Sequence, residues 1–572
     1  MCVFHSNKIG KLNWRDDVTI VTRTILLIVL FDAPANETRP LPHGASKLEA
    51  ALASHQPTWT APLPRSIVLR VDPLESWLGA EGFRVAPHSK RDEMTVTAST
   101  GAGAMHGALR LATAIAASPA GSWARFVAGA RDPMQATFPL LRTAARFEYR
   151  ALKINMPWSA YRNSSETALS WDAMRNLSFW TSYLDAAADN GFNVLSIWSM
   201  HPYPLLLRSK SFPKATTIGD AELEAWRALH VAIFKLARDR AIEPYLVDWN
   251  VFVSEGFEQH YDSTSHSDTD GASGNASMSA LSQQYNRECI TQMIDEYDDL
   301  AGIGISLGDR VHNMNLSQQL EWVEAVVFPA IHAAKRGDEI KLIYRAAFGE
   351  GTDRNNDAQM QRECLKRSGI NGARIWVQLK FNWSHGHSTT TLVHVHGGGK
   401  AEGFYVPPPT SEEYRVTWMM RNEDFFALRW GNAPFTRAHV AVNGESWVGG
   451  YAIGSEGYIP ALDYFVKKTK NTAVGDLDVW SFQRQWLFYA TWGQTLFDGV
   501  PSNVAAADAS LAGLFVKKYG ATAQPWAGDL LQGYVRSFLP PAPLCVFTLL
   551  FTAHSPSHNF GVDAVLGLIY YF

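Results

Sequence analysis

The chain has few cysteines and little net charge. Its 572 residues include only Cys2, Cys289, Cys364 and Cys545, and no two of them have the spacing of a CxxC motif. This scatter argues against a disulfide scaffold and against a structural zinc site. The net charge is −4 and no long basic block occurs. Nucleic-acid binding usually needs a basic patch, so we expect no nucleic-acid partner.

Long hydrophobic runs are also missing. Residues 25–31 (ILLIVLF) and the apolar stretches within 540–572 are too short to cross a bilayer, so we expect no stable membrane insertion. Residues 25–31 could be the core of a signal peptide, but about twenty-four residues precede them and Asp16 and Asp17 interrupt the leading region. We favour a first β-strand. Without a clear signal peptide the localisation stays open, and a secreted or endomembrane protein is compatible with the sequence.

Hydrophobic and aromatic residues are abundant. They make up 46% and 12% of the chain, with 20 Trp, which is enough for a large core and for several domains. Several Trp lie at expected strand ends, among them Trp198 and Trp249. Aromatic rings stack on the apolar faces of sugars, although ordinary packing explains any single Trp equally well.

Residues 20–140 are typical of a small α/β domain. Apolar runs and turn residues predict strands at 25–31, 66–72, 82–87 and 94–99. Helices are expected at 45–54 and at 101–118, where GAGAMHGALRLATAIAAS is rich in small residues that suit close packing on a sheet.

From Arg142 onward a unit of strand, polar tip and amphipathic helix repeats. Its clearest example is 301–309 (AGIGISLGD), a buried parallel strand that ends in a turn and a carboxylate. Eight strands are expected, at 149–156, 193–200, 242–249, 301–308, 339–346, 373–381, 425–430 and 447–453, with 416–420 as an alternative seventh strand. The pattern predicts an α/β fold, a (β/α)₈ TIM barrel over 142–478, preceded by the 20–140 domain. A helical region, 479–572, follows, and whether its end is native stays open.

The order of these parts resembles a known group of enzymes. The string AMHGALRLATAI, followed by ARFEYRALKINMPW at the start of the barrel, is similar to the glycoside hydrolases of families 67 and 20. These α-glucuronidases and β-hexosaminidases share an N-terminal α/β domain ahead of a (β/α)₈ barrel, and the likeness covers roughly 20–500. Family 20 has an adjacent Asp-Glu pair after the fourth strand, whereas this chain has Asp309 and Arg310. That departure speaks against a mechanism that uses the substrate's N-acetyl group.

Cleavage of a glycosidic bond needs two carboxyl groups, one as acid and one as base or nucleophile. Asp309, directly after the fourth strand, is our first choice for the acid, and Glu456, just past the eighth strand in GSEGYIP, is our choice for the second group. Each could equally be a turn or loop residue. The other carboxylates near strand ends are Asp248, Glu255, Glu423, Asp424 and Glu445.

Cationic residues near strand ends bear on the substrate. Lys153, Arg345, Lys380 and Arg429 lie on the first, fifth, sixth and seventh expected strands. Either a uronic acid carboxylate or an internal acid would complement them. Other candidates for contact with the sugar are His201, Asn250, His385 and His387, which could bind hydroxyl groups, and Trp198 and Trp249, which could stack on the ring.

The loop at 381–399 contains two HxH pairs, His385 with His387 and His394 with His396. Alternating histidines can bind a metal, but no acidic or cysteine partner is near, so we favour sugar contact and assign neither a metal nor a cofactor. We therefore expect an exo-acting glycoside hydrolase with a carbohydrate substrate, α-glucuronidase-like and acting on an acidic sugar. The alternatives are a β-N-acetylhexosaminidase-like hydrolase, a metal-dependent hydrolase or lyase, and an inactive sugar-binding barrel. The sequence leaves the oligomeric state open.

Overall fold

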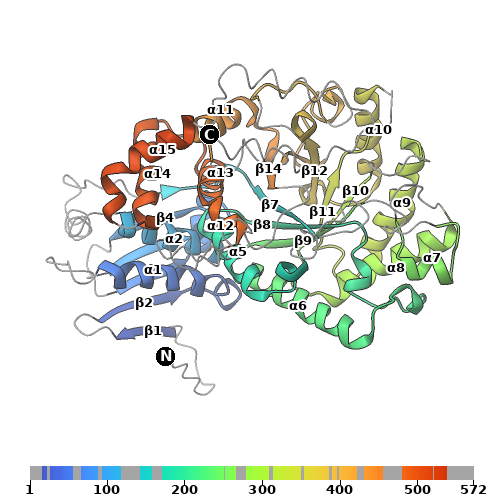
Figure 1. Cartoon of the computed structure of the whole chain (residues 1–572), viewed down its shortest axis with the longest axis horizontal. Helices are drawn as coiled ribbons and strands as arrows, with labels where there is room; N and C mark the ends of the chain where they lie inside the picture. The colour runs from blue at the N-terminus through green and yellow to red at the C-terminus, as the bar shows by residue number, and fades with distance from the viewer. Residues whose placement is uncertain are drawn as a thin grey trace, which may run out of the picture.

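The computed structural model describes residues 16–21, 26–55, 66–87, 93–117, 142–156, 171–249, 252–265, 279–307, 314–348, 353–384, 389–395, 399–421, 431–454, 480–519 and 521–536. Within these ranges the chain forms a small mixed sheet with two helices, a closed barrel, and a group of C-terminal helices. Figure 1 shows the small sheet and the C-terminal helices together on one side of the barrel.

The N-terminal sheet has six strands in the order β1-β2-β3-β5-β4-β6. Strands β2, β3 and β5 run parallel, and the other pairings are antiparallel. The strands are β1 (Asp16–Val21), β2 (Leu26–Asp32), β3 (Ser66–Val71), β4 (Phe83–Pro87), β5 (Glu93–Ala98) and β6 (Arg142–Thr143). The strand favoured at 25–31 is confirmed as β2, whereas β1 and β6 were not anticipated.

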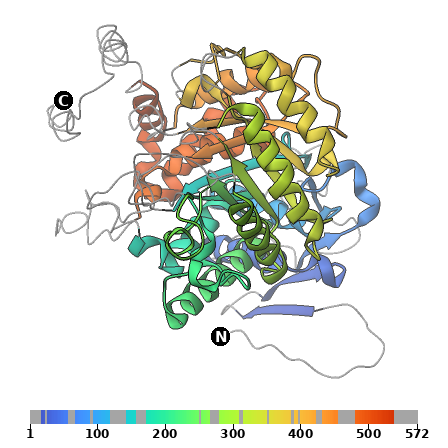
Figure 2. The same ribbon diagram turned by 90° about the vertical axis from the view of Figure 1, so that its right-hand side faces the viewer.

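Helices α1 (Leu41–His55) and α2 (Gly101–Ala117) pack on each other and on this sheet. Alternate side chains of a strand point to the same face, and on β3 these are Ile67, Leu69 and Val71, which join one buried cluster with α1 and α2. Both helices were predicted. Figure 2 shows β1 at the outer edge of the sheet, on the side away from the barrel.

The barrel consists of eight parallel strands, and its closed order is β10-β11-β12-β13-β14-β7-β8-β9. Pairing of β14 with β7, and of β9 with β10, leaves no open edge. The strands are β7 (Tyr149–Asn155), β8 (Val194–Ser199), β9 (Glu243–Trp249), β10 (Gly302–Ser306), β11 (Lys341–Arg345), β12 (Ile375–Lys380), β13 (Arg415–Arg421) and β14 (Val448–Gly454). The predicted TIM barrel is thereby confirmed.

Helices surround the barrel and continue into the C-terminal group. They are α5 (Leu177–Asp189), α6 (Asp220–Arg238), α7 (Glu255–His260), α8 (Ala280–Glu296), α9 (Leu316–Ala333), α10 (Arg354–Arg367), α11 (Ala433–Asn443), α12 (Ser481–Arg484), α13 (Trp486–Asp498), α14 (Val504–Tyr519) and α15 (Ala527–Arg536). Short 3₁₀ turns join several elements, among them η4 (Tyr203–Leu205) between β8 and α6.

Two details of the sequence prediction are corrected. The seventh strand was expected first at 425–430, but the strand that pairs with both β12 and β14 is β13 at Arg415–Arg421, so the alternative at 416–420 is confirmed. A barrel strand needs partners on both sides, and an apolar run cannot reveal which segment has them. Asp220, an aspartate directly before an apolar helical face, is predicted by its sequence position to be an N-cap, but it is the first helical residue and Gly219 is the N-cap.

Charged contacts connect the N-terminal sheet domain to the barrel. Arg150 on β7 is fully buried and its guanidinium donates two hydrogen bonds to Glu81, at 2.7 and 2.9 Å. At the surface, Arg39 bridges Asp239 and Asp299 of the barrel. The first expected domain boundary, at 140–142, lies between β5 and β7. The division of the chain into 20–140, 142–478 and 479–572 stays a prediction.

Candidate functional site

Large side chains fill the interior of the barrel. One buried cluster combines residues from all around the barrel: Tyr149, Ala151, Val194, Trp198, Met200, Tyr245, Val247, Phe252, Ala301, Ile343, Trp376, Met419 and Ala452. Because side chains alternate along a strand, the members of this cluster that lie on strands identify the inward-facing positions of every barrel strand except β10. The barrel interior is therefore a packed core, and a (β/α)₈ barrel usually carries its site at the carboxyl ends of the strands.

Small residues on β10 make room for this packing. A Cβ atom at Gly304 would lie 2.6 Å from Cγ2 of Val247 and 3.1 Å from Cβ of Ile343. At Gly302 it would lie 2.2 Å from the Tyr245 ring. The two glycines in AGIGIS thus face the interior, and the next inward position on β10 is Ser306.

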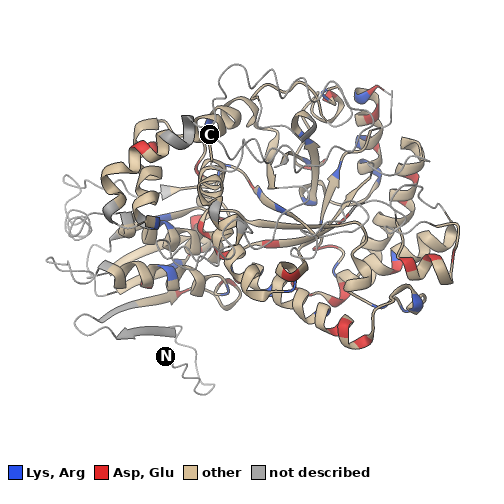
Figure 3. Ribbon diagram, in the orientation of Figure 1, with Lys and Arg blue, Asp and Glu red and all other residues tan. Residues whose placement is uncertain are grey.

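Three of the four predicted cations face the interior at the carboxyl end. Lys153 is two residues beyond Ala151, Arg345 is two beyond Ile343, and Lys380 is four beyond Trp376, so alternation points all three inward. Their side chains are buried, with exposed fractions of 2%, 2% and 3%. Figure 3 shows the positive positions on the barrel strands in blue. The structure thus brings Lys153, Arg345 and Lys380 to the same end of the barrel, which we call the rim.

Neighbouring side chains hold two of these cations in place. The Nζ atom of Lys153 lies 4.6 Å from the centre of the Trp198 ring, and the indole of Trp198 donates a 2.8 Å hydrogen bond to Ser196. On the other side of the barrel, Nη1 of Arg345 donates to Oγ of Ser306 at 3.0 Å. These contacts fix the direction of the charged groups, and Trp198, a predicted site residue, takes part in them.

At the opposite end of the interior, where the strands begin, the charged side chains pair with one another. Glu243 at the start of β9 accepts hydrogen bonds from Lys341 Nζ at 2.7 and 2.8 Å, and from the Tyr245 hydroxyl at 3.1 Å. Further along the strands toward the rim, Nε2 of Gln378 donates a 2.8 Å hydrogen bond to the Tyr149 hydroxyl. Burial raises the pKa of Tyr149 well above its usual range, so the phenol stays neutral.

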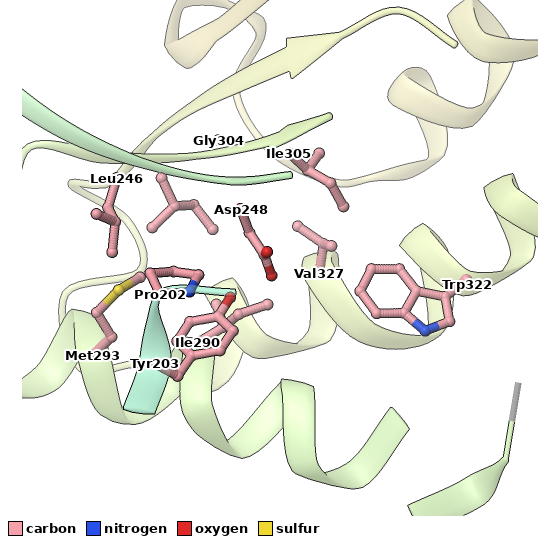
Figure 4. A pocket seen from close by; sticks show the side chains of 11 residues that line it. Pro202, Tyr203, Leu246, Asp248, Ile290, Met293, Gly304, Ile305, Trp322 and Val327 are labelled. Carbon is pink, nitrogen blue, oxygen red and sulfur yellow. The ribbon is translucent and has the colours of Figure 1, made fainter. Parts of the chain in front are cut away.

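Asp248 lies outside the interior. It alternates with the inward residues of β9, and it lines a cavity of about 10 Å³ between the barrel and helices α8 and α9, together with Tyr203 and Trp322. Figure 4 shows its carboxylate near the Tyr203 hydroxyl. This cavity holds one water molecule at most and is too small for a sugar. Asp248 is thus a buried side chain outside the barrel interior and does not face the rim.

His201 belongs to the same outer layer. Its Nε2 atom lies 3.1 Å from the Tyr285 hydroxyl on α8, and its ring packs edge-on against Tyr203. Burial lowers the pKa of His201 to about 3, so the imidazole is neutral at ordinary pH. The structure therefore places His201 among aromatic residues of the helix layer and does not bring it together with the rim cations.

Several predicted residues cannot be placed. Asp309, Glu456, Asn250, His385, His387 and Arg429 lie outside the described residues. Trp249 ends β9, but its side chain is not among those described. In the chain, Asp309 comes three residues after the end of β10, and Glu456 two residues after the end of β14. Their assignment as catalytic residues stays a prediction.

The described residues form neither a metal-binding cluster nor a membrane-spanning helix. Among the described residues, no three His, Cys, Asp or Glu side chains gather closely enough to bind a metal ion. Of the four histidines in the HxH pairs, only His394 lies within these ranges. No helix in the described part of the chain is long and apolar enough to cross a bilayer.

Sequence reasoning missed one polar residue at the rim, Asn155 at the end of β7. It follows Ala151 and Lys153 in the same alternation, and its exposed fraction is 6%. Counting in steps of two from Lys153 could have found it, but an isolated asparagine carries no chemical signal of its own.

Comparison with solved structures identifies the fold. A GH138 enzyme targeting pectin rhamnogalacturonan II matches with a TM-score of 0.67 and 18% identity, covering 90% of this chain and 55% of that one. The fold is one that glycoside hydrolases use. The present chain spans about half the length of that enzyme. The expected architecture, an α/β domain ahead of a (β/α)₈ barrel, is thereby confirmed.

Two further structures match more distantly. A GH20 β-N-acetylhexosaminidase from Streptomyces coelicolor A3(2) has a TM-score of 0.44 and 15% identity, covering 90% of this chain and 93% of that one. A GH115 4-O-methyl-α-glucuronidase has a TM-score of 0.45 and 11% identity, covering 88% of this chain and 61% of that one. No protein-family model matches the chain. Curated protein sequences give no match either.

Proposed function

We propose that this protein is an exo-acting glycoside hydrolase that removes an acidic sugar, with an α-glucuronidase-like preference for a uronic acid. The observation that carries this proposal is the group of three buried cations, Lys153, Arg345 and Lys380, at the rim of the barrel. In (β/α)₈ enzymes the active site lies at this end.

The cations favour a carboxylate as part of the ligand. The guanidinium of Arg345 can donate two parallel hydrogen bonds to one carboxylate, and the ammonium groups of Lys153 and Lys380 add point charges. In a buried setting such charge-assisted hydrogen bonds are stronger than those between neutral groups. A neutral sugar would bring no negative charge to these groups, so we expect the site to prefer uronic acids.

Catalysis is assigned to Asp309 and Glu456. In this proposal Asp309 protonates the leaving oxygen, and Glu456 either activates water or attacks the anomeric carbon. Both residues follow barrel strands closely in the chain, β10 and β14, whose carboxyl ends belong to the rim. The distance between the two carboxyl groups decides the outcome, about 6.5–9.5 Å for inversion and about 5–5.5 Å for retention.

The test begins with a panel of aryl glycosides. It contains glucuronides, galacturonides, the matching neutral glucosides and galactosides, and N-acetylhexosaminides, together with rhamnogalacturonan II, which the GH138 enzyme targets. We expect turnover of a uronide and little turnover of its neutral counterpart. Turnover of an N-acetylhexosaminide instead would favour the hexosaminidase alternative. Loss of activity with a chelator would favour the metal-dependent one, and binding without product the inactive barrel.

Two variants then test the role of the rim. Arg345→Met and Lys380→Met should each lower kcat/KM for the uronide by about 10–100-fold, which corresponds to loss of a charged hydrogen bond. The ratio of uronide to neutral activity should fall with it. Lys341→Met is the matched control, because Lys341 shares β11 with Arg345 but pairs with Glu243 at the opposite end of the interior. An unchanged ratio in both rim variants would contradict the acidic substrate.

The acid role of Asp309 has a separate signature. Asp309→Asn should slow cleavage of natural linkages much more than cleavage of activated aryl glycosides, because a good leaving group needs little protonation. Equal losses on both kinds of substrate would speak against Asp309 as the acid while leaving the rest of the proposal intact.

A further inference from the structure

Asn155 is the last residue of β7 and faces the rim next to Lys153. The backbone register pairs Asn155 with Trp198 on β8. The Nζ atom of Lys153 lies 4.6 Å from the centre of the Trp198 ring. An amide, an ammonium group and an indole from two adjacent strands therefore occupy the same part of the rim.

The amide of Asn155 is buried and makes no hydrogen bond to the described part of the chain. Its side chain is 6% exposed, and neither Nδ2 nor Oδ1 has a hydrogen-bond partner among the described residues. Leaving a buried donor and a buried acceptor unsatisfied costs folding free energy, so natural proteins rarely do it in a core. When such a group faces the carboxyl end of a (β/α)₈ barrel, a ligand is its expected partner.

The contrast with other buried asparagines supports this interpretation. Asn443 on α11 has a similar burial, 9% exposed, yet its Nδ2 donates to the carbonyl oxygens of Thr390 at 2.8 Å and His439 at 3.1 Å. Asn382, 6% exposed, accepts from the backbone N–H of Val393 at 2.8 Å and donates to the carbonyl of Thr391 at 2.8 Å. These two amides stabilise loops, whereas Asn155 makes no such contact.

We propose that Asn155 is a substrate-binding residue that recognises the hydroxyl groups of the sugar ring bound at the rim. This inference rests on the proposed glycoside hydrolase function and adds a specificity element to it. An amide offers one donor and one acceptor, and each ring hydroxyl can both donate and accept. Two adjacent hydroxyl groups would satisfy both atoms at once. Asn155 then selects the ring configuration, while the cations select the carboxylate.

The kinetic test uses Asn155→Leu, which keeps the approximate size of the side chain and removes both polar atoms. We expect kcat/KM for the best uronide to fall by about 100-fold, as two hydrogen bonds are lost. With an analogue that lacks both contacted hydroxyl groups, wild type and variant should differ by less than about 3-fold, because both partners are already absent. Singly deoxygenated analogues at each ring position identify these two hydroxyl groups, because each of the two should reduce the difference only in part. Equal losses of activity on every analogue would overturn the inference.

The stability of the free protein gives a second readout. Removing polar atoms that have no partner should leave the melting temperature of Asn155→Leu equal to that of wild type or raise it. Asn443→Leu is the matched control and should lower the melting temperature, because it breaks two hydrogen bonds. A drop for Asn155→Leu as large as that for Asn443→Leu would mean a structural role and would overturn the inference.

Binding experiments separate this inference from the hydrolase proposal. D-glucuronic acid and D-galacturonic acid are used as probes in calorimetry, with no need for turnover. If wild type binds one of them without hydrolysing any uronide and Asn155→Leu does not bind, the binding role stands while the hydrolase proposal fails. If wild type hydrolyses a uronide and Asn155→Leu does so equally well, the binding role fails while the hydrolase proposal stands.

Discussion

Replacing Glu81 by Gln should weaken the attachment of the N-terminal sheet domain to the barrel. In the wild type, Glu81 receives two hydrogen bonds from Arg150, at 2.7 and 2.9 Å, and a third from Nδ2 of Asn193 at 3.2 Å. The side chains of Arg150 and Glu81 are 0% and 12% exposed. Glutamine keeps the shape but removes the charge, which leaves a fully buried guanidinium without a counter-ion.

The size of the effect follows from this burial. Removing one partner of a buried ion pair costs about 3–5 kcal/mol. An unfolding entropy of about 2.1 cal/mol/K per residue gives about 1.2 kcal/mol/K for 572 residues that unfold as one unit. The melting temperature should therefore fall by about 3–4 °C. Arg39→Ala breaks a pair between the same two domains that is 39% exposed on the arginine side, and it should cost less than about 1 kcal/mol.

The dependence of stability on pH provides a further check of this ion pair. Burial alone would raise the pKa of Glu81, but Arg150 and the nearby His106 outweigh it and hold the pKa well below its usual range. The folded protein therefore binds fewer protons at this site than the unfolded chain. The stabilisation is fully present above the unfolded pKa of about 4.3 and is lost as pH falls below it. The gap between wild type and Glu81→Gln should accordingly narrow below about pH 4.

Differential scanning calorimetry of wild type, Glu81→Gln, Arg150→Met and the double variant measures these effects. The double variant should recover at least half of the loss of the worse single variant, because no unpaired charge remains buried. If Glu81→Gln melts within 1 °C of wild type, or if the two single losses simply add, the buried pair does not hold the domains together as described.

Two other predictions concern the barrel and its helices. Burial lowers the pKa values of His201, His230 and His439 to about 3, 4 and 3, so the unfolded chain binds more protons than the folded protein between those values and about 6.5. Stability should fall with decreasing pH in that window, by up to about 4 kcal/mol per pH unit for the three together, and replacing His201 by Gln should reduce the slope of the urea midpoint against pH. Gly304→Val should overfill the interior and cost at least about 1–3 kcal/mol in urea unfolding, whereas Gly219→Ala, where a Cβ meets no atom within 4 Å, should cost much less.

The barrel was predictable because its signal is repeated and local. Each strand is a short apolar run with a polar end, and amphipathic helices lie between the strands, such as α6, whose Leu223, Trp226 and Ile233 are buried. Because the unit is repeated, an error in one unit does not change the fold. The seventh strand shows the limit of this reasoning. Arg415–Arg421 and the apolar run at 425–430 both fit a strand, and only pairing with β12 and β14 decides between them.

The site was less predictable because direction depends on register. Lys153 and Asp248 both lie near the ends of strands, but alternation turns the first toward the interior and the second toward Tyr203 in the helix layer. A shift of one residue in either strand would turn the side chain on that strand to the other face of the barrel wall. The side chain of Asn155 carried no sequence signal, since its importance lies in the absence of partners within the described fold.

The junction between β14 and β7 has a consequence for synthesis on the ribosome. Gly450 pairs with Tyr149, so about 300 residues separate the two partners in the chain. At about 5–20 residues per second, roughly 15–60 s pass between the synthesis of β7 and that of β14, its second neighbouring strand. During that time a row of backbone donors and acceptors is open to association with other nascent chains. Starting synthesis of fewer chains at a time, or chaperones that shield an exposed strand, should therefore raise the yield of native protein.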